Sequence, residues 1–185
     1  MTENNKQSGL RAVYLVSLAL WCGGSVFFSY LAAPRIFSYL QDQLPSHPPP
    51  GVQGLTAAVG RRLAGDTVGA IFPTYFLSQI GLGALAVASG LRLAWGRRRL
   101  EKIHCGLAIA AFAFVSLHSV TVYPHSVRVL DQHYQAQEAG DEPKATELRK
   151  MFGMWHGISQ SLNLATIVLV VAAVILAGIA MRDTK

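Results

Sequence analysis

Residues 164–180 read LATIVLVVAAVILAGIA, a run of almost entirely apolar side chains. The run lies within 31 consecutive uncharged residues between Lys150 and Arg182. A helix rises about 1.5 Å per residue, so about 20 apolar residues cross a bilayer core of roughly 30 Å. The segment is therefore predicted to be a transmembrane helix, and this prediction sets the class of fold.

Three similar stretches precede it. They contain 23, 25 and 25 uncharged residues and lie between Arg11 and Arg35, Asp66 and Arg92, and Lys102 and Arg128. Backbone amides in lipid need hydrogen-bond partners within their own segment, which predicts helices and not strands. We expect an all-α integral membrane protein, an up-down four-helix bundle, with spans at about 12–33, 68–91, 103–124 and 158–181. The first uncharged stretch is longer than the apolar core of a signal peptide, about 7–15 residues, so it is interpreted as a true span.

The composition agrees with this class. Hydrophobic residues make up 51% of the chain and charged residues 14%, whereas a soluble domain carries roughly 25% charged residues. The net charge is +6, but the charges lie between the apolar runs and do not form one basic surface. We therefore expect contact with the lipid bilayer and no nucleic-acid partner. Two cysteines are too few for a disulfide scaffold.

The basic residues predict the orientation. Segments 1–11, 92–102 and 182–185 together hold nine Lys and Arg, whereas the other two connections hold seven, along with most of the acids. The cluster Arg97-Arg98-Arg99 lies beside two spans, where the positive-inside rule is strongest. Both termini are predicted to be cytoplasmic, with loops 34–67 and 125–157 facing outward. If the protein is bacterial, its membrane is expected to be the plasma (inner) membrane.

The two outward loops differ in character. Residues 45–50 read PSHPPP and predict a stiff, non-helical spacer. The helical spacing of Val52, Leu55, Val59 and Leu63 then predicts a short helix on the outer membrane surface. In the second loop, residues 125–138 should extend the third helix to a turn at 140–143, and the fourth helix should run from about 143 to 181, longer than a bilayer requires.

Polar residues gather in the outer part of the spans, where burial in lipid is costly. His156, Ser159, Gln160 and Asn163 share one face of the fourth helix. Tyr75 and Gln79 lie at a similar depth in the second helix. We predict an outward polar cleft lined by His156, Asn163, Tyr75 and Gln79. The alternative is that these groups only pack helices together and anchor them at the interface.

Proline has a separate effect in the second span. Pro73 has no N–H, so the carbonyl of Gly69, four residues earlier, loses its usual helical partner.

A metal or haem site is a second hypothesis. His118 and His156 are its candidate ligands, because the third and fourth helices should be neighbours. The spacing of haem-attachment and zinc-protease motifs is absent, so no cofactor is predicted in the first interpretation. Asp and Glu are absent from all four spans, which argues against a proton relay of membrane carboxylates.

Several short motifs resemble a known family. One motif, in the fourth helix, consists of Leu148-Arg149, Phe152, His156-Gly157, Ser159 and Asn163-Leu164. Two more are Phe72-Pro73-x-Tyr75-Phe76 in the second helix and Trp21-x-Gly23-Gly24 in the first. They resemble the transmembrane protein 205-like family, also called domain of unknown function 4149. The resemblance implies a four-helix membrane protein of unsettled activity, and it adds Arg149 to the candidate site.

A more distant likeness is to the copper-resistance D and protoporphyrinogen oxidase J group of four-helix membrane proteins. That group has a haem-ligating histidine seven residues before the first-span tryptophan. Here the corresponding position is Tyr14.

Three functions remain open from the sequence. The first is a non-enzymatic membrane protein, which would be a transporter-like, ligand-binding or complex-assembly subunit, working as a homo-oligomer or within a larger membrane complex. The second is a haem- or metal-dependent redox protein, and the third is a structural subunit of a respiratory or photosynthetic complex.

The first two functions predict different spectra. We expect protein purified in mild detergent to show no Soret band and no stoichiometric metal, because the sequence carries no standard ligand motif. An ultraviolet–visible spectrum with elemental analysis measures this. A Soret band, or bound iron or copper, would instead favour the redox function and direct mutagenesis to His118 and His156.

Overall fold

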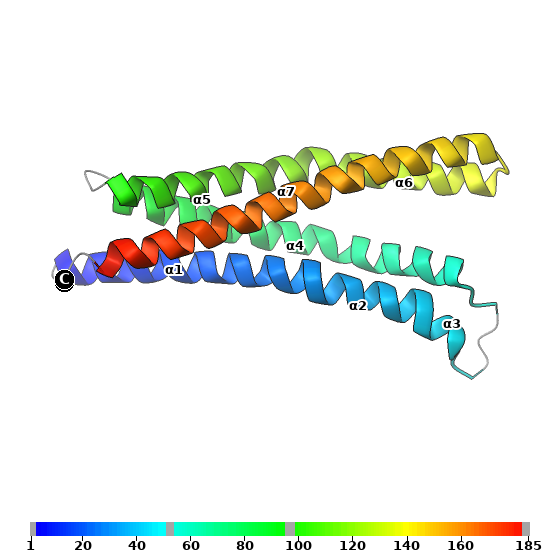
Figure 1. Ribbon diagram of the computed structural model, residues 1–185, viewed down its shortest axis with the longest axis horizontal. Coiled ribbons are helices and arrows are strands. Elements are labelled where there is room, and N and C mark those ends of the chain that lie inside the picture. The colour runs from blue at the N-terminus through cyan, green and yellow to red at the C-terminus, as the bar shows by residue number, and fades with distance from the viewer. Residues whose placement is uncertain (1–2, 51–53, 95–98, 183–185) are drawn as a thin grey trace.

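The computed structural model describes residues 3–50, 54–94 and 99–182 as four long helical rods (Figure 1). The second rod is α4 (Ala57–Ala94) and the fourth is α7 (Glu142–Arg182). The other two rods contain π-helical turns, written η. The first consists of α1 (Glu3–Val26), η1 (Phe27–Ala32), α2 (Ala33–Ser38), η2 (Tyr39–Gln43) and α3 (Leu44–Ser46). The third consists of α5 (Arg99–Leu117), η3 (His118–Val122) and α6 (Tyr123–Glu138).

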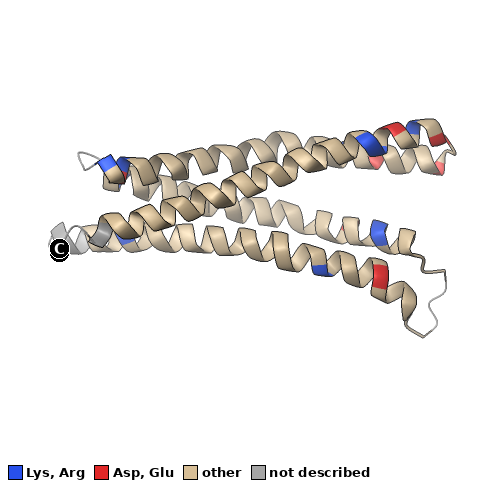
Figure 2. Ribbon diagram, viewed as in Figure 1, with Lys and Arg blue, Asp and Glu red and all other residues tan. Residues whose placement is uncertain are grey.

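The rods run alternately up and down, so α1 begins and α7 ends at the same end of the bundle (Figure 1). We call this the terminal end and the opposite one the loop end. Each rod contains a helix long and apolar enough to cross a membrane. The prediction of an all-α four-helix membrane bundle is confirmed. Charged residues lie mainly towards the two ends, and the middle of the bundle is almost free of them (Figure 2).

The helices continue well past the predicted spans at the loop end. The rods extend over Gln7–Ser46, Ala57–Ala94, Arg99–Glu138 and Glu142–Ala180. The third and fourth helices extend as predicted, and the turn between them uses Gly140 at φ 74°. Asp141 caps α7, since the backbone N–H of Lys144 donates to its Oδ1 at 3.1 Å.

The predicted spacer at 45–50 is non-helical at residues 47–50 only, and the predicted surface helix is wrong. Pro45 and Ser46 are helical, because α3 continues the first rod and a proline is tolerated in the first turn of a helical segment. The separate surface helix does not exist: Val59 and Leu63 belong to the first turns of α4, and Leu55 precedes it. The Oγ1 of Thr56 accepts the N–H of Val59 at 3.2 Å and starts α4, after which no proline interrupts the helix until Pro73. Val52 lies outside the described residues.

The π-helical turns lie next to prolines. The N–H of Ala33, just before Pro34, donates to the carbonyl of Phe28, and the N–H of Tyr123, just before Pro124, donates to that of His118. Both bonds span five residues instead of four. Widening the helix in this way gives space to a proline that supplies no N–H of its own.

The hydrophobic core occupies the terminal half of the bundle. Its buried members include Tyr14, Leu18 and Trp21 of α1 together with alanines of the other rods: Ala86, Ala108, Ala111, Ala173 and Ala177. At the loop end, a second and separate core joins only α6 to α7, through Val129, Ala136, Ala145 and Leu148. The four rods therefore share one core at the terminal end and separate into two pairs beyond it (Figure 1).

Gly60 holds the first and second rods together at the loop end. A Cβ built on Gly60 would collide with the backbone carbonyl of Leu40 in η2. We expect Gly60→Ala to destabilise the fold by about 1–3 kcal/mol, the usual cost of overpacking, because a backbone atom cannot rotate away. Thermal unfolding in detergent measures the effect. The control is Gly69→Ala, where the added Cβ meets no atom within 4 Å; equal stability of the two variants would contradict the prediction.

Candidate ligand cavity between the helices

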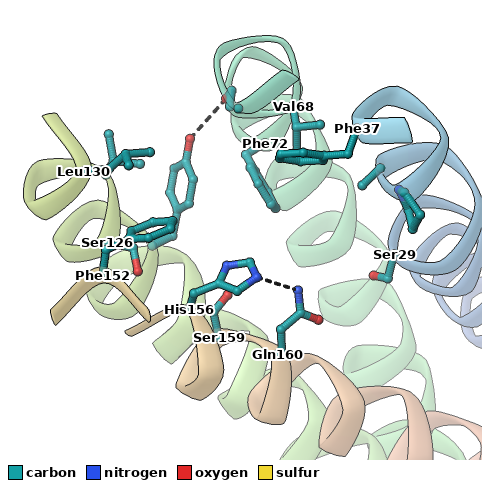
Figure 3. Close-up of a pocket in the computed structure, with 16 residues that line it drawn as sticks. Ser29, Phe37, Val68, Phe72, Ser126, Leu130, Phe152, His156, Ser159 and Gln160 are labelled. Atoms are coloured by element: carbon teal, nitrogen blue, oxygen red, sulfur yellow. Dashed lines mark hydrogen bonds between the residues drawn. The ribbon is translucent and has the colours of Figure 1, made fainter. Parts of the chain in front are cut away.

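A cavity of about 410 Å³ lies where the rods separate (Figure 3). All four rods contribute to its wall: η1 and α2, α4, α6, and α7. The lining residues are Ser29, Ala33, Pro34, Phe37, Gly65, Val68, Gly69, Phe72, Tyr123, Ser126, Val127, Leu130, Phe152, His156, Ser159 and Gln160. The wall is mostly apolar and aromatic, with a few hydroxyl, amide and imidazole groups. Ligand pockets commonly have this composition.

A smaller cavity of about 60 Å³ adjoins it on the side of the shared core. There the side-chain amide of Asn163 donates to Ser29 Oγ at 2.9 Å, and the hydroxyl of Tyr75 donates to Asn163 Oδ1 at 3.4 Å. His118 Nε2 lies 2.6 Å from the hydroxyl of Ser159. These bonds join all four rods and form a polar, uncharged floor.

A third cavity of about 310 Å³ lies towards the loop end and shares Phe37, Gly65, Leu130 and Phe152 with the main one. Three arginines line it: Arg61 and Arg62 of α4 and Arg149 of α7. The shared residues place the three cavities next to one another along the bundle. Together they lead from the polar floor, past aromatic walls, to a basic rim.

One side of this space is closed by a contact between α4 and α6. Arg62 forms an ion pair with Glu138 at 2.9 Å, and its guanidinium lies 4.6 Å from the ring centre of Tyr134. The two charged side chains are 50% and 62% exposed, so the ion pair stabilises the fold by at most about 1 kcal/mol. Its importance is geometric, because it links the two pairs of rods.

The opposite side, between α2 and α7, is open. Pro34 on α2 and His156 and Gln160 on α7 line the cavity and are nevertheless exposed. On the closed side, Val68 and Ser126 are buried. In Figure 3, His156 and Gln160 lie at the edge of the space, joined by a hydrogen bond with 3.4 Å between Nε2 and Nε2.

The carbonyl freed by Pro73 has found a donor. The hydroxyl of Tyr123 donates to the carbonyl oxygen of Gly69 at 3.1 Å. Tyr123 also lies against Phe72 and Phe76, with ring centroids 5.0 and 5.2 Å apart. The bond fixes α4 to the third rod inside the cavity wall.

The structure places four of the five predicted site residues around the three adjoining cavities. His156 lines the main part, Asn163 and Tyr75 the floor, and Arg149 the rim. Gln79 is elsewhere: it is 2% exposed, lines none of these cavities, and its Oε1 accepts a hydrogen bond from Ser25 at 2.7 Å. It joins α1 to α4, which agrees with the packing alternative.

Sequence reasoning missed several groups at the cavity. Ser126 is 8% exposed, and its hydroxyl is buried without a hydrogen-bond partner in the described structure. Ser29 and Arg61 were also missed. The signal that could have identified Ser126 is its position two residues after Pro124. That position faces the cavity only because the π turn η3 sets the phase of α6, which the sequence pattern does not show.

The two candidate metal ligands bond to different neighbours. His118 pairs with Ser159 in the floor, whereas His156 pairs with Gln160 at the open side. Among residues 3–50, 54–94 and 99–182, no three His, Cys, Asp or Glu side chains are arranged to hold a metal ion. The arrangement does not favour the redox alternative.

A separate pair lies in the core towards the terminal end. The hydroxyl of Tyr14 is 2.9 Å from Nδ1 of His104, and it donates to the backbone carbonyl of His104 at 3.2 Å. Tyr14 is fully buried and His104 is 2% exposed. Tyr14, which occupies the position of the haem-ligating histidine in the distant group, therefore binds α1 to α5.

The chain matches the family model described as domain of unknown function (DUF4149) over residues 16–135. This match covers more than half of the chain, and the protein belongs to that family. The matched region covers most of the first three rods. The motif at 148–164 that resembled the family lies beyond the matched region. Neither the comparison with curated proteins nor the comparison with solved structures gave a match. The distant likeness to the copper-resistance D group has no support from them.

The bond between Tyr123 and Gly69 predicts a coupling with Pro73. Tyr123→Phe should destabilise the protein by about 1 kcal/mol, because a partly buried carbonyl loses its donor. In a Pro73→Ala background the residue at 73 regains an N–H for that carbonyl, so the same change should cost less. A double-mutant cycle by thermal unfolding in detergent measures this. Tyr30→Phe, at an exposed tyrosine, is the control; additive effects would contradict the proposed bond.

Proposed function

We propose that this membrane protein is non-enzymatic and binds a small molecule in the cavity between its four helices. The observation that carries the proposal is the row of adjoining cavities from polar floor to basic rim. Its main part, about 410 Å³, is within the range of about 300–1,000 Å³ that is typical of ligand pockets.

The groups in the cavity support binding more than chemistry. His118 and Ser159 form a base–hydroxyl pair at 2.6 Å. No carboxylate among the described residues bonds His118 to orient it, as a hydrolytic triad requires. None of the described residues lining the main cavity and the floor is charged.

The proposal includes orientation and assembly. With both termini in the cytoplasm, as the positive-inside rule predicts, the basic rim faces the outer side of the membrane. Four helices alone rarely enclose a full pathway across a membrane, so we propose that the protein acts as a homo-oligomer or as a subunit of a larger membrane complex. Release of the bound molecule to a partner would make such a complex transporter-like.

A plug in the cavity tests the proposal. Gly65 lines both the main cavity and the rim, and a Cβ there meets no atom within 4 Å, so the longer side chain of Gly65→Leu should occupy part of the space. We expect small molecules extracted from purified wild-type protein to be absent from this variant when measured by mass spectrometry. His156→Ala should lower occupancy more than Cys22→Ala, since Cys22 lines no described cavity.

Gly81→Leu is the matched control for the plug. Gly81 is in the same helix, also has no atom within 4 Å of an added Cβ, and is exposed away from the cavities. This variant should keep the bound molecule. Empty extracts from the wild type, or equal occupancy in the two leucine variants, would overturn the proposed function.

A further inference from the structure

The rim of the cavity has an unusual charge. Arg61, Arg62 and Arg149 line it, and no Asp or Glu is among its described lining residues. Glu138 neutralises Arg62 through the ion pair. Arg61 is held by a neutral partner, since its Nε donates to Gln41 Oε1 at 3.1 Å. Asp66 and Asp131 are close to Tyr134 but line none of the three cavities.

Arg61 and Arg149 are therefore the two rim arginines whose charge no ion pair in the described structure neutralises. Both are exposed, and they reach the same cavity from different rods, α4 and α7. A guanidinium forms paired, charge-assisted hydrogen bonds with carboxylate or phosphate. The chemistry of the rim thus selects an anionic group.

The depth of the rim matches that of lipid headgroups. Arg35, Asp66 and Arg128 mark the loop-end limit of the uncharged stretches. Arg61 precedes Asp66 by five residues, about 7.5 Å along the helix. The interfacial layer on each side of a bilayer core is about 5–8 Å thick. The main cavity then lies at the outer edge of the hydrocarbon layer, with Val68 and Phe72 just inside it.

The cavity also opens in the direction from which a lipid would come. Its open side is the seam between α2 and α7, where Pro34, His156 and Gln160 are exposed, whereas Arg62 and Glu138 close the seam between α4 and α6. Phe37, Phe72 and Phe152 offer apolar walls next to this opening. The unpartnered hydroxyl of Ser126 offers a polar contact part of the way in. An amphiphile could enter sideways without leaving the membrane plane.

We propose that the ligand is a membrane amphiphile with an anionic headgroup, an inference that rests on the proposed function. Arg61 and Arg149 bind the phosphate or carboxylate of the headgroup. An apolar chain occupies the main cavity after entering between α2 and α7.

The test uses full-length protein in nanodiscs of phosphatidylcholine with a minor share of phosphatidylglycerol. Lipid retained by the protein is measured by native mass spectrometry. The wild type should retain phosphatidylglycerol in preference to phosphatidylcholine. Arg61→Gln and Arg149→Gln should each lower its retention about tenfold, as expected for a lost charge-assisted hydrogen bond. Arg61→Lys and Arg149→Lys should restore part of it.

Arg128→Gln is the matched control, because Arg128 is exposed in α6 and lines none of the cavities. It should retain as much phosphatidylglycerol as the wild type. Equal losses in all three glutamine variants would mean general attraction to the membrane surface and would overturn the proposal. Thermal unfolding of each variant shows that a loss of lipid is not a loss of fold.

A second arm separates a lipid from a free anion. Inorganic phosphate added to the nanodiscs should not displace phosphatidylglycerol, because it has no chain to fill the cavity. Displacement by phosphate would overturn the membrane source of the ligand. Equal retention of the two lipids, with Gly65→Leu still emptying the cavity, would overturn the anionic class and leave the proposed function intact.

Discussion

The close approach of the four rods in the terminal half determines the rest of the structure. Ala86, Ala108, Ala111, Ala173 and Ala177 are all fully buried there. Lipid is as apolar as these side chains, so helix association in a membrane depends on van der Waals packing, which small residues permit. Where these alanines end, prolines and aromatic rings follow, and the rods continue as two pairs, α6 with α7 and the first rod with α4. The cavity is the consequence of that change.

Glycines complete the packing of the shared core. A Cβ on Gly83 would approach Phe112 and Trp21 at 2.7 and 3.0 Å, and one on Gly90 would approach Tyr14 at 2.9 Å. Large rings of α1 and α5 thus fit against bare backbone of α4. This half is dense and rigid, and it holds the ends of the rods from which the cavity walls extend.

Polar groups in the cavity satisfy one another across rods. Unpaired polar groups in hydrocarbon are costly. Asn163 bonds to Ser29 and Tyr75, His118 to Ser159, and Tyr123 to the backbone of Gly69. These bonds hold the rods at a fixed separation where the core no longer does. The Ser126 hydroxyl is buried without such a partner in the described structure, and it is on the wall that a ligand would contact.

Family membership and cavity architecture overlap only in part. The matched region, residues 16–135, contains η1, α4 and η3, which supply Ser29, Tyr75 and His118. The polar face of α7 lies outside the matched region and supplies His156, Ser159, Gln160 and Asn163. The cavity therefore needs the fourth helix as much as the family domain, and a ligand would contact both.

The sequence alone determined that this is a four-helix membrane protein, because runs of uncharged residues have one stable conformation in lipid. It also placed His156, Ser159, Gln160 and Asn163 on one face, since helical periodicity is local, and it identified the freed carbonyl of Gly69 from Pro73. Only the tertiary structure decided what these faces meet. Gln79 bonds to Ser25, Arg61 lines the same cavity as Arg149, and Tyr123 donates to the carbonyl of Gly69. These pairings arise because the π turns shift the phase of the first and third rods, and because the packing of alanines sets where the rods separate. Both depend on contacts between segments far apart in the chain, which no local pattern contains.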